Sequence, residues 1–422
     1  MQQPSPPSRP TRVLLLTQWF DPEPTFKGMV FARELVRQGF EVEVVTGFPN
    51  YPGGKVYPGY RIKLLQREVI DGVQVTRLPL YPNHDQSAVK RVLNYASFAA
   101  SALVYGLFVA RRADVMYAYH PPLTVGIAAS LIRLLRRIPV VYDIQDMWPD
   151  TLRATGMLSN PKALKLVAAA CSWVYRRVDH IVVLSPGFKR LLVQRGVPAA
   201  KVDVIYNWAD EAALASPTGL LPVAFPAAGQ FRILFAGNMG KAQALGSVLD
   251  AAALLQARGS RVCFVMLGGG VELGALKDQA AQRQLHNVVF LPAVPMAEVG
   301  AYLNAADALL VHLRKDPLFE ITIPSKTQAY MAVGKPLLMA VDGDAADLVR
   351  QSGGGMVAGS ENAEALAEAA EALAGTAPQT LAAMGQQAQQ FYRKHLALAV
   401  GVGRFGTVFR QIALHSQQQR SG

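Results

Sequence analysis

Short runs of β-branched and aliphatic residues alternate with longer amphipathic segments along most of the chain. Each run is typical of a strand, and its alternation with helical patterns favours parallel sheets flanked by helices. Strands of a first domain are predicted at residues 12–17, 41–46, 73–78, 115–118, 140–142, 180–184 and 202–206. Strands of a second domain are predicted at residues 231–236, 262–267, 288–291, 308–313, 337–340 and 355–357. The pattern therefore predicts an α/β protein with two doubly wound, Rossmann-like domains.

The pattern loses its periodicity between residues 207 and 230, where Pro217, Pro222 and Pro226 accompany several glycines and alanines. Such a segment is typical of an interdomain linker. The expected organisation is a flexible tail over 1–10, a first domain over 11–207, a linker over 208–230, a second domain over 231–395, and a C-terminal helix over 396–422 with a frayed end from Ser416. Two such domains facing one another would bound a ligand cleft at the carboxyl edges of their strands.

Composition narrows the class of protein. The chain has 422 residues, of which 51% are hydrophobic and 17% charged, which suits two large buried cores. Cys171 and Cys263 lie far apart in apolar contexts, so neither a disulfide framework nor a metal cluster is expected and a reducing compartment is indicated. The formal charge of +12 suits an acidic surface or substrate. Nucleic acid is not the expected partner, because the basic residues are dispersed and no zinc-finger or RNA-binding motif occurs.

Two apolar segments raise the question of a membrane. Residues 97–110 run into Arg111-Arg112, and residues 123–135 end at Arg136-Arg137. Both are shorter than the ~20 apolar residues that a spanning helix needs, and the N-terminal tail has no apolar signal core, so a cytoplasmic protein is predicted. Helices of this kind lie against anionic bilayers, which favours peripheral association with the inner membrane. The alternative is two buried helices with solvated arginines at their ends.

Glycine-rich turns follow two strands of the second domain. The first is Gly237-Asn238-Met239-Gly240-Lys241, and the second includes Gly268 and Gly269. Glycines let the backbone approach a phosphate, and Lys241 supplies positive charge. Tight turns between a strand and a helix need the same glycines, so packing alone is the alternative explanation.

The segment around Pro324-Ser325-Lys326-Thr327-Gln328 is the most informative. Pro324 fits the first turn of a helix, whose positive end would leave amides and hydroxyls at Ser325 and Thr327 for an anionic diphosphate. Lys326 adds a full charge, and Gln328 lies one turn further in, where its amide suits ribose hydroxyls. A simply capped helix start is the alternative.

Polar residues also follow strands of the first domain. A long loop over residues 18–28 contains Trp19, and His120 stands just past a predicted strand, where it would face the cleft or serve the structure alone. Asp143, Asp146 and Asp150 follow the next strand, and one of them would serve a hydroxyl-bearing substrate unless all three are caps and turn formers. No phosphate-loop lysine motif, zinc motif, nucleophile elbow or dinucleotide fingerprint occurs, so an NAD enzyme is not expected.

Six motifs occur in order along almost the whole chain and carry a family resemblance. They are the loop ending at Gly28, Tyr119-His120-Pro121-Pro122, Asp146-Met147-Trp148-Pro149-Asp150, Ile205-Tyr206-Asn207-Trp208, Gly237-Asn238-Met239-Gly240 and Ile323-Pro324-Ser325-Lys326. On these residues the chain resembles family-four glycosyltransferases of the GT-B fold, and among them the WbuB/WcaI-like branch of bacterial surface polysaccharide assembly. The resemblance implies retaining transfer without a metal ion or other cofactor, a donor domain at the C-terminal side, an acceptor domain at the N-terminal side, and a final helix that returns to the first domain.

The resemblance also implies roles for individual residues. His120 would touch the transferred sugar and support the positive charge that develops at its anomeric carbon. Catalytic roles fall on His120, Glu320 and Lys326. Donor contacts fall on Gly28, Gly237, Asn238, Gly240, Lys241, Gly268, Gly269, Pro292, Ser325, Lys326, Thr327 and Gln328, with the base near residues 290–294. Acceptor-side contacts fall on Trp19, Asp146 and Trp148.

The chain departs from the family pattern at two places. Many members carry two glutamates separated by seven residues, whereas here Glu320 is followed by Gln328, or by Ala329 if the register is taken from Gly334-Lys335-Pro336. The usual arginine and lysine of the phosphate loop are replaced by Asn238 and Gln243. Lys241 and Lys326 are therefore the cations expected at the donor.

Three functional hypotheses follow. The first is transfer of an N-acetylhexosamine or N-acetylfucosamine from a UDP-sugar to an undecaprenyl-diphosphate-linked saccharide at the cytoplasmic face of the inner membrane, for O-antigen, capsule or exopolysaccharide. The second is a UDP-sugar 2-epimerase of the same fold, which would consume no acceptor. The third is a non-catalytic nucleotide-sugar-binding protein.

Overall fold

The structure is a computed structural model that describes residues 9–83, 88–214, 225–226 and 229–421. Most of the expected tail and residues 215–224 and 227–228 of the expected linker lie outside these described residues. The chain divides into two compact units. Unit 1 comprises Met1–Leu184, Phe188–Tyr206 and Gly401–Gly422, and unit 2 comprises Ser185–Gly187 and Asn207–Val400. The end of the chain therefore belongs to unit 1.

Unit 1 is built on an eight-stranded sheet in the order β3-β4-β2-β1-β5-β6-β7-β8. Its strands are β1 (Arg12–Leu16), β2 (Glu41–Gly47), β3 (Gln66–Ile70), β4 (Val73–Leu78), β5 (Val115–His120), β6 (Val140–Ile144), β7 (His180–Val183) and β8 (Val202–Val204). All neighbours are parallel except β3, which pairs antiparallel with β4. β3 could not be predicted from the sequence, because this edge strand alternates between half-buried and exposed residues and has no apolar run.

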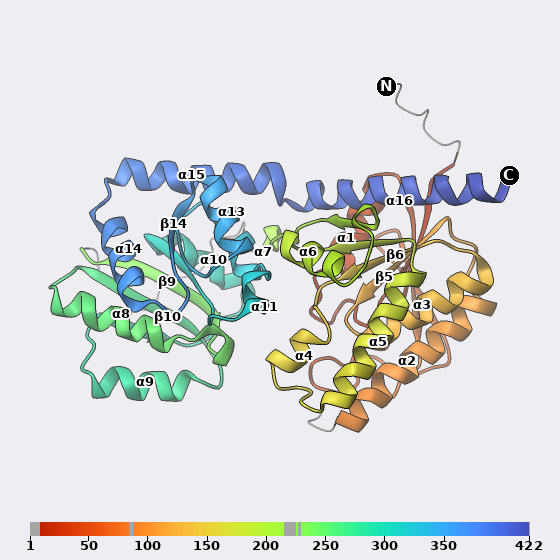
Figure 1. The fold of residues 1–422 in the computed structure, drawn as a ribbon, viewed down its shortest axis with the longest axis horizontal. Coiled ribbons are helices and arrows are strands. Elements are labelled where there is room, and N and C mark those ends of the chain that lie inside the picture. Colours follow the sequence, from red (N-terminus) through yellow and green to blue (C-terminus); the bar gives the residue numbers. More distant parts are fainter. Residues whose placement is uncertain (1–8, 84–87, 215–224, 227–228, 422) are drawn as a thin grey trace. The chain divides into compact units, whose positions relative to one another are not determined.

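Helices cover both faces of this sheet (Figure 1). They are α1 (Met29–Arg37), α2 (Ala88–Phe108), α3 (Leu123–Arg136), α4 (Asp150–Ala154), α5 (Pro161–Arg177), α6 (Pro186–Gln194) and α16 (Leu398–Ser421). On one face Phe405 of α16 packs against Phe31 of α1 and Tyr117 of β5, at ring-centre distances of 5.2 and 5.7 Å. On the other face Tyr142 of β6 lies against α3 and α5. The returning helix thus closes a buried aromatic cluster of unit 1.

Unit 2 carries a six-stranded parallel sheet in the order β11-β10-β9-β12-β13-β14. Its strands are β9 (Phe231–Asn238), β10 (Val262–Gly269), β11 (Val288–Leu291), β12 (Ala308–His312), β13 (Leu337–Ala340) and β14 (Gly355–Ala358). Its helices are α7 (Glu211–Leu214), α8 (Gly246–Ala257), α9 (Leu273–Gln282), α10 (Met296–Ala305), α11 (Pro317–Glu320), α12 (Ser325–Val333), α13 (Asp344–Ser352), α14 (Ala363–Gly375) and α15 (Pro378–His395). Aliphatic side chains of α8 and α14 pack with Ile233 and Phe235 of β9 in one core.

Every strand predicted from the sequence is present, and both sheets are of the predicted parallel, doubly wound kind. One expectation was wrong: α16 does not fray from Ser416 but continues as a helix to Ser421. Glutamine and arginine dominate these last turns and are good helix formers, and the Nε2 atoms of His415 and Gln419 lie 2.8 Å apart. None of the helices in the described part of the chain combines the length and apolar character that a bilayer span requires.

Candidate active site

The carboxyl ends of β9 and β10 form a glycine-lined edge in unit 2. Gly237 and Gly268 are opposite one another in the sheet, with φ values of +127° and +139°. A β-carbon on Gly268 would collide with the carbonyl oxygen of Gly237, and one on Gly270 would collide with that of Met239. Glycine is therefore required for the backbones to meet here, and the edge is left bare of side chains, as a bound phosphate needs.

Lys326, in the first turn of α12, lies over this glycine edge. A β-carbon on Gly237 would sit 3.2 Å from Lys326 Nζ, and Nζ is 4.7 Å from the centre of the Phe235 ring. Burial lowers the pKa of Lys326 to about 8. Among the described residues no carboxylate forms an ion pair with this ammonium. A desolvated cation without a protein counter-ion is well suited to receive an anion.

The start of α12 adds backbone donors beside this ammonium. The N-cap is Pro324, and no side chain caps the helix. The first hydrogen bond runs from the Thr327 amide to the Pro324 carbonyl at 2.9 Å, so Pro324 lies one position outside the first turn where the sequence analysis expected it. The amides of Ser325 and Lys326 precede that bond and therefore remain available at the positive end of the helix.

Thr327 and Gln328, near the start of α12, have buried side chains. Their exposed fractions are 0% and 2%. Neither Thr327 Oγ1 nor Gln328 Oε1 has a hydrogen-bond partner within the described residues. Since buried polar atoms are normally satisfied, these oxygens are candidates for contact with a ligand or an ordered water.

Gln243 and His312 hold the loop that follows β9. Gln243 Oε1 accepts the amide of Gly240 at 3.0 Å and lies 3.5 Å from Asn238 Nδ2. His312 Nδ1 lies 2.7 Å from the Gln243 carbonyl oxygen. Burial lowers the pKa of His312, and its Nε2 lacks a partner within the described residues. The sequence analysis missed His312, although it ends a strand, the same signal that singled out His120.

The other expected donor residues lie around the same sheet. Gly269 is opposite Asn238, and Pro292 directly follows β11, the neighbour of β10. Lys241 is exposed at the start of a short 3-10 segment. Glu320 ends α11 with an exposed side chain. The glycine turns and the start of α12 are therefore brought together, while no contact ties Glu320 to them.

His120 ends β5 in unit 1 and is enclosed by aromatic rings. It is 2% exposed and lies edge-on to Trp148 and Tyr142, with ring centres 5.1 and 5.8 Å away. Burial lowers its pKa to about 3, so the imidazole is neutral around pH 7. Its Nδ1 has no hydrogen-bond partner in the part of the chain that the structure describes. A neutral imidazole can exchange hydrogen bonds with a sugar hydroxyl but supplies no positive charge.

The three candidate aspartates have different environments. Asp143 is fully buried and accepts hydrogen bonds from Tyr117 at 2.5 Å and from Gln145 at 2.6 Å. Burial raises the pKa of Asp143, and the buried Lys27 opposes that shift. Asp150 begins α4 and forms an ion pair with Arg195.

Asp146 differs from both of these aspartates. It is half-buried, and burial alone raises its pKa. Its carbonyl oxygen accepts the amide of Trp148 at 3.0 Å. Asp146 is therefore the best placed of the three to serve a substrate hydroxyl.

Trp19 belongs to an aromatic and amide cluster beyond β1 and β2. Its ring lies 4.7 Å from Tyr51 and 6.4 Å from Tyr95. The residues that precede these aromatics in the sequence form a chain of amides: Gln18 donates to Asn94 at 2.5 Å, and Asn94 in turn donates to Asn50 at 3.3 Å. Gln18 Oε1 has no partner within the described residues. Aromatic faces beside amides are typical of saccharide recognition, and this amide chain could not be read from positions so far apart in the sequence.

Packing within unit 1 explains why residue 28 is a glycine. It is the N-cap of α1, and a β-carbon there would collide with the carboxylate of Asp21. Asp21 accepts the amide of Met29 at 2.6 Å and so caps the helix. A donor group that contacted Gly28 would therefore compete with the Asp21 carboxylate, which already occupies the start of α1.

Within the described residues, no group of three or more His, Cys, Asp or Glu side chains is arranged to hold a metal ion. The groups gathered at unit 2 are an ammonium, backbone amides and glycines, which are donors for a phosphate.

Two family models match the chain, one in each half. Residues 29–208 match the "Glycosyl transferase 4-like domain", and residues 230–375 match "Glycosyl transferases group 1". These matches, with the two parallel-sheet units, identify a glycosyltransferase of the GT-B fold. The chain belongs to the family-four glycosyltransferases.

Known proteins agree with this assignment. A protein of Escherichia coli (strain K12) named as a colanic acid biosynthesis glycosyl transferase, WcaI, is 29% identical over 316 residues, which span 71% of this chain and 75% of that relative. Sucrose-phosphate synthase from Thermosynechococcus elongatus has the same fold, with a TM-score of 0.72 at 15% identity over 95% of this chain and 99% of its own. The structure of Anabaena HepE in complex with UDP and glucose has a TM-score of 0.66 at 16% identity, over 95% of this chain and 100% of its own.

Proposed function

We propose that this glycosyltransferase moves an N-acetylhexosamine or N-acetylfucosamine from a UDP-sugar to a lipid-linked saccharide, with retention of configuration and without a metal ion. The acceptor is an undecaprenyl-diphosphate saccharide at the cytoplasmic face of the inner membrane, and the product belongs to O-antigen, capsule or exopolysaccharide. The observation that carries the proposal is the desolvated ammonium of Lys326 over the glycine edge, without a carboxylate partner among the described residues. The presence of UDP in the HepE structure supports the choice of donor.

The donor diphosphate is the leaving group of this reaction. As the bond between the anomeric carbon and the diphosphate oxygen breaks, its electron pair stays on UDP. The acceptor hydroxyl oxygen forms the new bond on the same face of the sugar, and its proton passes to the departing phosphate. Lys326 and the amide of Ser325 stabilise the charge that grows on the diphosphate. Glu320 or Gln328 binds the ribose, and the backbone near Pro292 binds the base.

Unit 1 supplies the acceptor contacts in this proposal. Trp19 offers an aromatic face to the saccharide, and Asp146 and Trp148 line the acceptor side. His120 contacts the transferred sugar as a neutral imidazole, because its pKa of about 3 leaves it uncharged. It acts through a hydrogen bond or the dipole of its ring.

The surface of α2 supports a membrane-bound acceptor. Apolar side chains three or four residues apart form one exposed stripe along the helix. The stripe consists of Val89, Leu93, Ala96, Ala100, Val104 and Phe108. Basic pairs lie near both ends of the stripe, Lys90-Arg91 in its first turn and Arg111-Arg112 after its last residue. An apolar stripe between cations is typical of a helix that lies in the surface of an anionic bilayer. The remaining apolar segment, in α3, is mostly buried against the sheet.

The test is a panel of UDP-sugars incubated with and without undecaprenyl-diphosphate saccharides, in buffer containing EDTA, followed by mass spectrometry. A sugar-extended lipid formed in EDTA supports the proposal and identifies both substrates. A 2-epimerised donor formed without acceptor would move the assignment to the epimerase. Donor binding without turnover, unaffected by His120→Ala, would indicate a binding protein. Loss of activity that Mg²⁺ or Mn²⁺ restores would contradict metal independence.

A further inference from the structure

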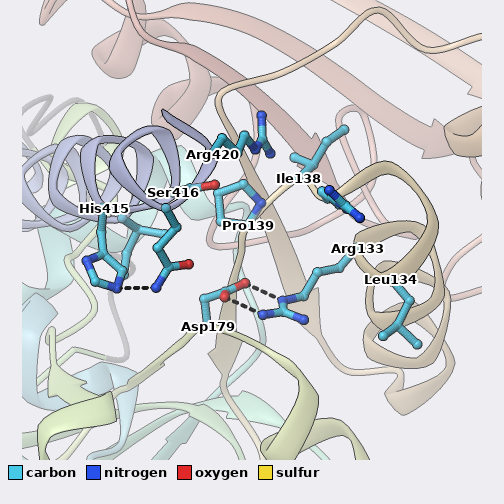
Figure 2. Close-up of a pocket in the computed structure, with 11 residues that line it drawn as sticks. Arg133, Leu134, Ile138, Pro139, Asp179, His415, Ser416 and Arg420 are labelled. Atoms are coloured by element: carbon cyan, nitrogen blue, oxygen red, sulfur yellow. Dashed lines mark hydrogen bonds and ion pairs between the residues drawn. The ribbon is translucent and has the colours of Figure 1, made fainter. Parts of the chain in front are cut away.

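A cavity lies in unit 1 at the amino edge of its sheet. It has a volume of about 550 Å³ and is bounded by the end of α3, the start of β6 and the last turns of α16 (Figure 2). His120 ends β5, whereas Ile138 and Pro139 at this cavity precede β6, the parallel neighbour of β5. The cavity is therefore at the opposite edge of the sheet from His120. Its volume lies within the roughly 300–1,000 Å³ of small-molecule pockets.

The one carboxylate that lines this cavity is already engaged. Asp179 accepts Arg133 Nε at 2.6 Å and a second guanidinium nitrogen at 2.7 Å, as the dashed lines in Figure 2 show. It also accepts the backbone amide of Val140 at 2.8 Å. Both carboxylate oxygens are thus used within the fold. Asp179 therefore does not serve as the counter-ion of the other arginines of the cavity.

Arg137 and Arg420 are those other arginines. Arg420 projects from α16 and lies apart from the Arg133–Asp179 pair (Figure 2). Within the described residues neither Arg137 nor Arg420 forms an ion pair, and nearby Asp114 is held by Arg9 at 2.7 Å. The pKa of Arg420 is lowered by partial burial and by the positive charges of Arg112 and Arg137, against the opposing charge of Asp114. The cavity therefore has an excess of positive charge.

Exposed apolar side chains lie at the ends of the two helices that lead to this edge of the sheet. Leu134 and Leu135, next to Arg137 in sequence, are 48% and 70% exposed. Phe108, at the end of α2 just before Arg111-Arg112, is 81% exposed. Because α2 and α3 pack together and each leads into one of the parallel strands β5 and β6, both helices end at this edge of the sheet. A free phosphate would use only the arginines, whereas a phosphate attached to an acyl chain would use the apolar side chains as well.

We propose that the cavity between α3, β6 and α16 binds the phosphate headgroup of an anionic phospholipid, through Arg137 and Arg420, with Leu134, Leu135 and Phe108 against the lipid chains. The site is separate from the donor and acceptor sites. It would anchor the C-terminal end of α2, whereas Tyr95, which packs with Trp19, lies nearer the N-terminal end of this helix. It rests on the membrane association in the proposed function. It adds a specific lipid ligand to that surface.

The test uses the full chain and vesicles. Sedimentation with phosphatidylcholine vesicles containing phosphatidylglycerol is compared for wild type, the double variant Arg137→Gln/Arg420→Gln, and a control double variant, Arg258→Gln/Arg350→Gln, which removes equal charge from unit 2. The expected partition loss is about thirtyfold for the cavity variant, equivalent to about 1 kcal/mol for each arginine near an anionic surface. The control variant should partition like wild type, and all three proteins should bind UDP equally.

Several results would overturn the inference. A specific anionic lipid site would be contradicted if the cavity variant partitioned to the vesicles like wild type, or if both double variants lost the same amount of partition. It would also be contradicted if wild type bound equally well to vesicles of pure phosphatidylcholine. Calorimetric binding of inorganic phosphate that the cavity variant loses, with unchanged vesicle partition, would assign the cavity to a soluble anion and not to a lipid. A wild-type chain that extends the lipid-linked acceptor in detergent but ignores phosphatidylglycerol vesicles would overturn this inference alone and leave the proposed function standing.

Discussion

The ammonium of Lys326 lies directly over the backbone of Gly237, where a β-carbon would sit 3.2 Å from Nζ. A side chain at position 237 would crowd the cation, and a shorter side chain at position 326 would leave the glycine edge without charge. The two residues come from β9 and α12, far apart in the sequence. Their proximity brings a glycine turn and a helix start together, as an anion site requires.

Donor affinity should depend on pH through Lys326. Burial places its pKa at about 8 rather than its usual 10.5, so the free enzyme loses this charge as the pH rises through about 8. Bound diphosphate favours the charged form, and UDP affinity should therefore fall between pH 7 and pH 9. Calorimetric titration of UDP at both values measures this change. Lys326→Arg, whose guanidinium stays charged, is the control, and an equal fall in that variant would remove Lys326 as the cause.

Gly268 should tolerate no side chain. Its φ of +139° and the carbonyl oxygen of Gly237 leave no room for a β-carbon, so Gly268→Ala should destabilise unit 2 by about 1–3 kcal/mol and weaken UDP binding. Gly274→Ala is the matched control, since this glycine lies in α9 with nothing within 4 Å of a β-carbon, and it should be neutral or stabilising by about 0.5–1 kcal/mol. Thermal unfolding and UDP titration check both variants. A Gly268→Ala protein as stable as Gly274→Ala would contradict the steric argument.

His120 should make the fold sensitive to acid. The unfolded chain binds a proton near pH 6.5, whereas burial delays protonation in the folded state to about pH 3. Its contribution to stability is therefore complete above pH 6.5 and falls as the pH drops from 6.5 towards 3, by up to about 1.4 kcal/mol per pH unit. His120→Gln should lose less stability than wild type between pH 7 and pH 5 in urea unfolding. Exposed His286→Gln is the control and should follow the wild-type curve.

Trp19 should contribute to binding of the acceptor and not to binding of the donor. Because its ring packs with Tyr51 and Tyr95 in unit 1, Trp19→Ala should raise the KM for the lipid-linked saccharide about tenfold and leave UDP affinity unchanged. Steady-state transfer assays and UDP titration separate the two effects. Trp173→Ala, on α5, is the matched control. Loss of UDP affinity in the Trp19 variant alone would argue against an acceptor role.

The sheets could be predicted from the sequence because buried parallel strands are continuous apolar runs. Where that signal is missing, as in the half-exposed edge strand β3, the prediction failed. The polar end of α16 also lacked an apolar pattern, yet it is helical through its residue preferences. Local patterns thus identified the elements that form the cores but not those at their margins.

The candidate site could be predicted in part. Glycine turns and Pro-Ser-Lys are local signals, so Gly237, Gly268 and Lys326 could be found from the sequence. Hydrogen bonds between residues far apart in the sequence could not be found in this way. Examples are the bond between Gln243 and His312 and the chain from Gln18 through Asn94 to Asn50. Gly28 has a second explanation, since a β-carbon there would collide with the Asp21 carboxylate, and its donor contact stays a prediction. A residue type indicates a chemical possibility, and only its neighbours decide its role.

The most direct test of the central claim is a comparison of UDP and uridine binding to wild type and Lys326→Ala. If Lys326 holds the diphosphate, the variant should bind UDP roughly 10- to 150-fold more weakly, the equivalent of about 1.5–3 kcal/mol for a charge-assisted hydrogen bond, and should bind uridine as wild type does. Lys277→Ala, which removes an exposed lysine of α9 in the same unit, provides the comparison for charge alone. Unchanged UDP affinity in Lys326→Ala, or an equal loss for uridine, would contradict the account.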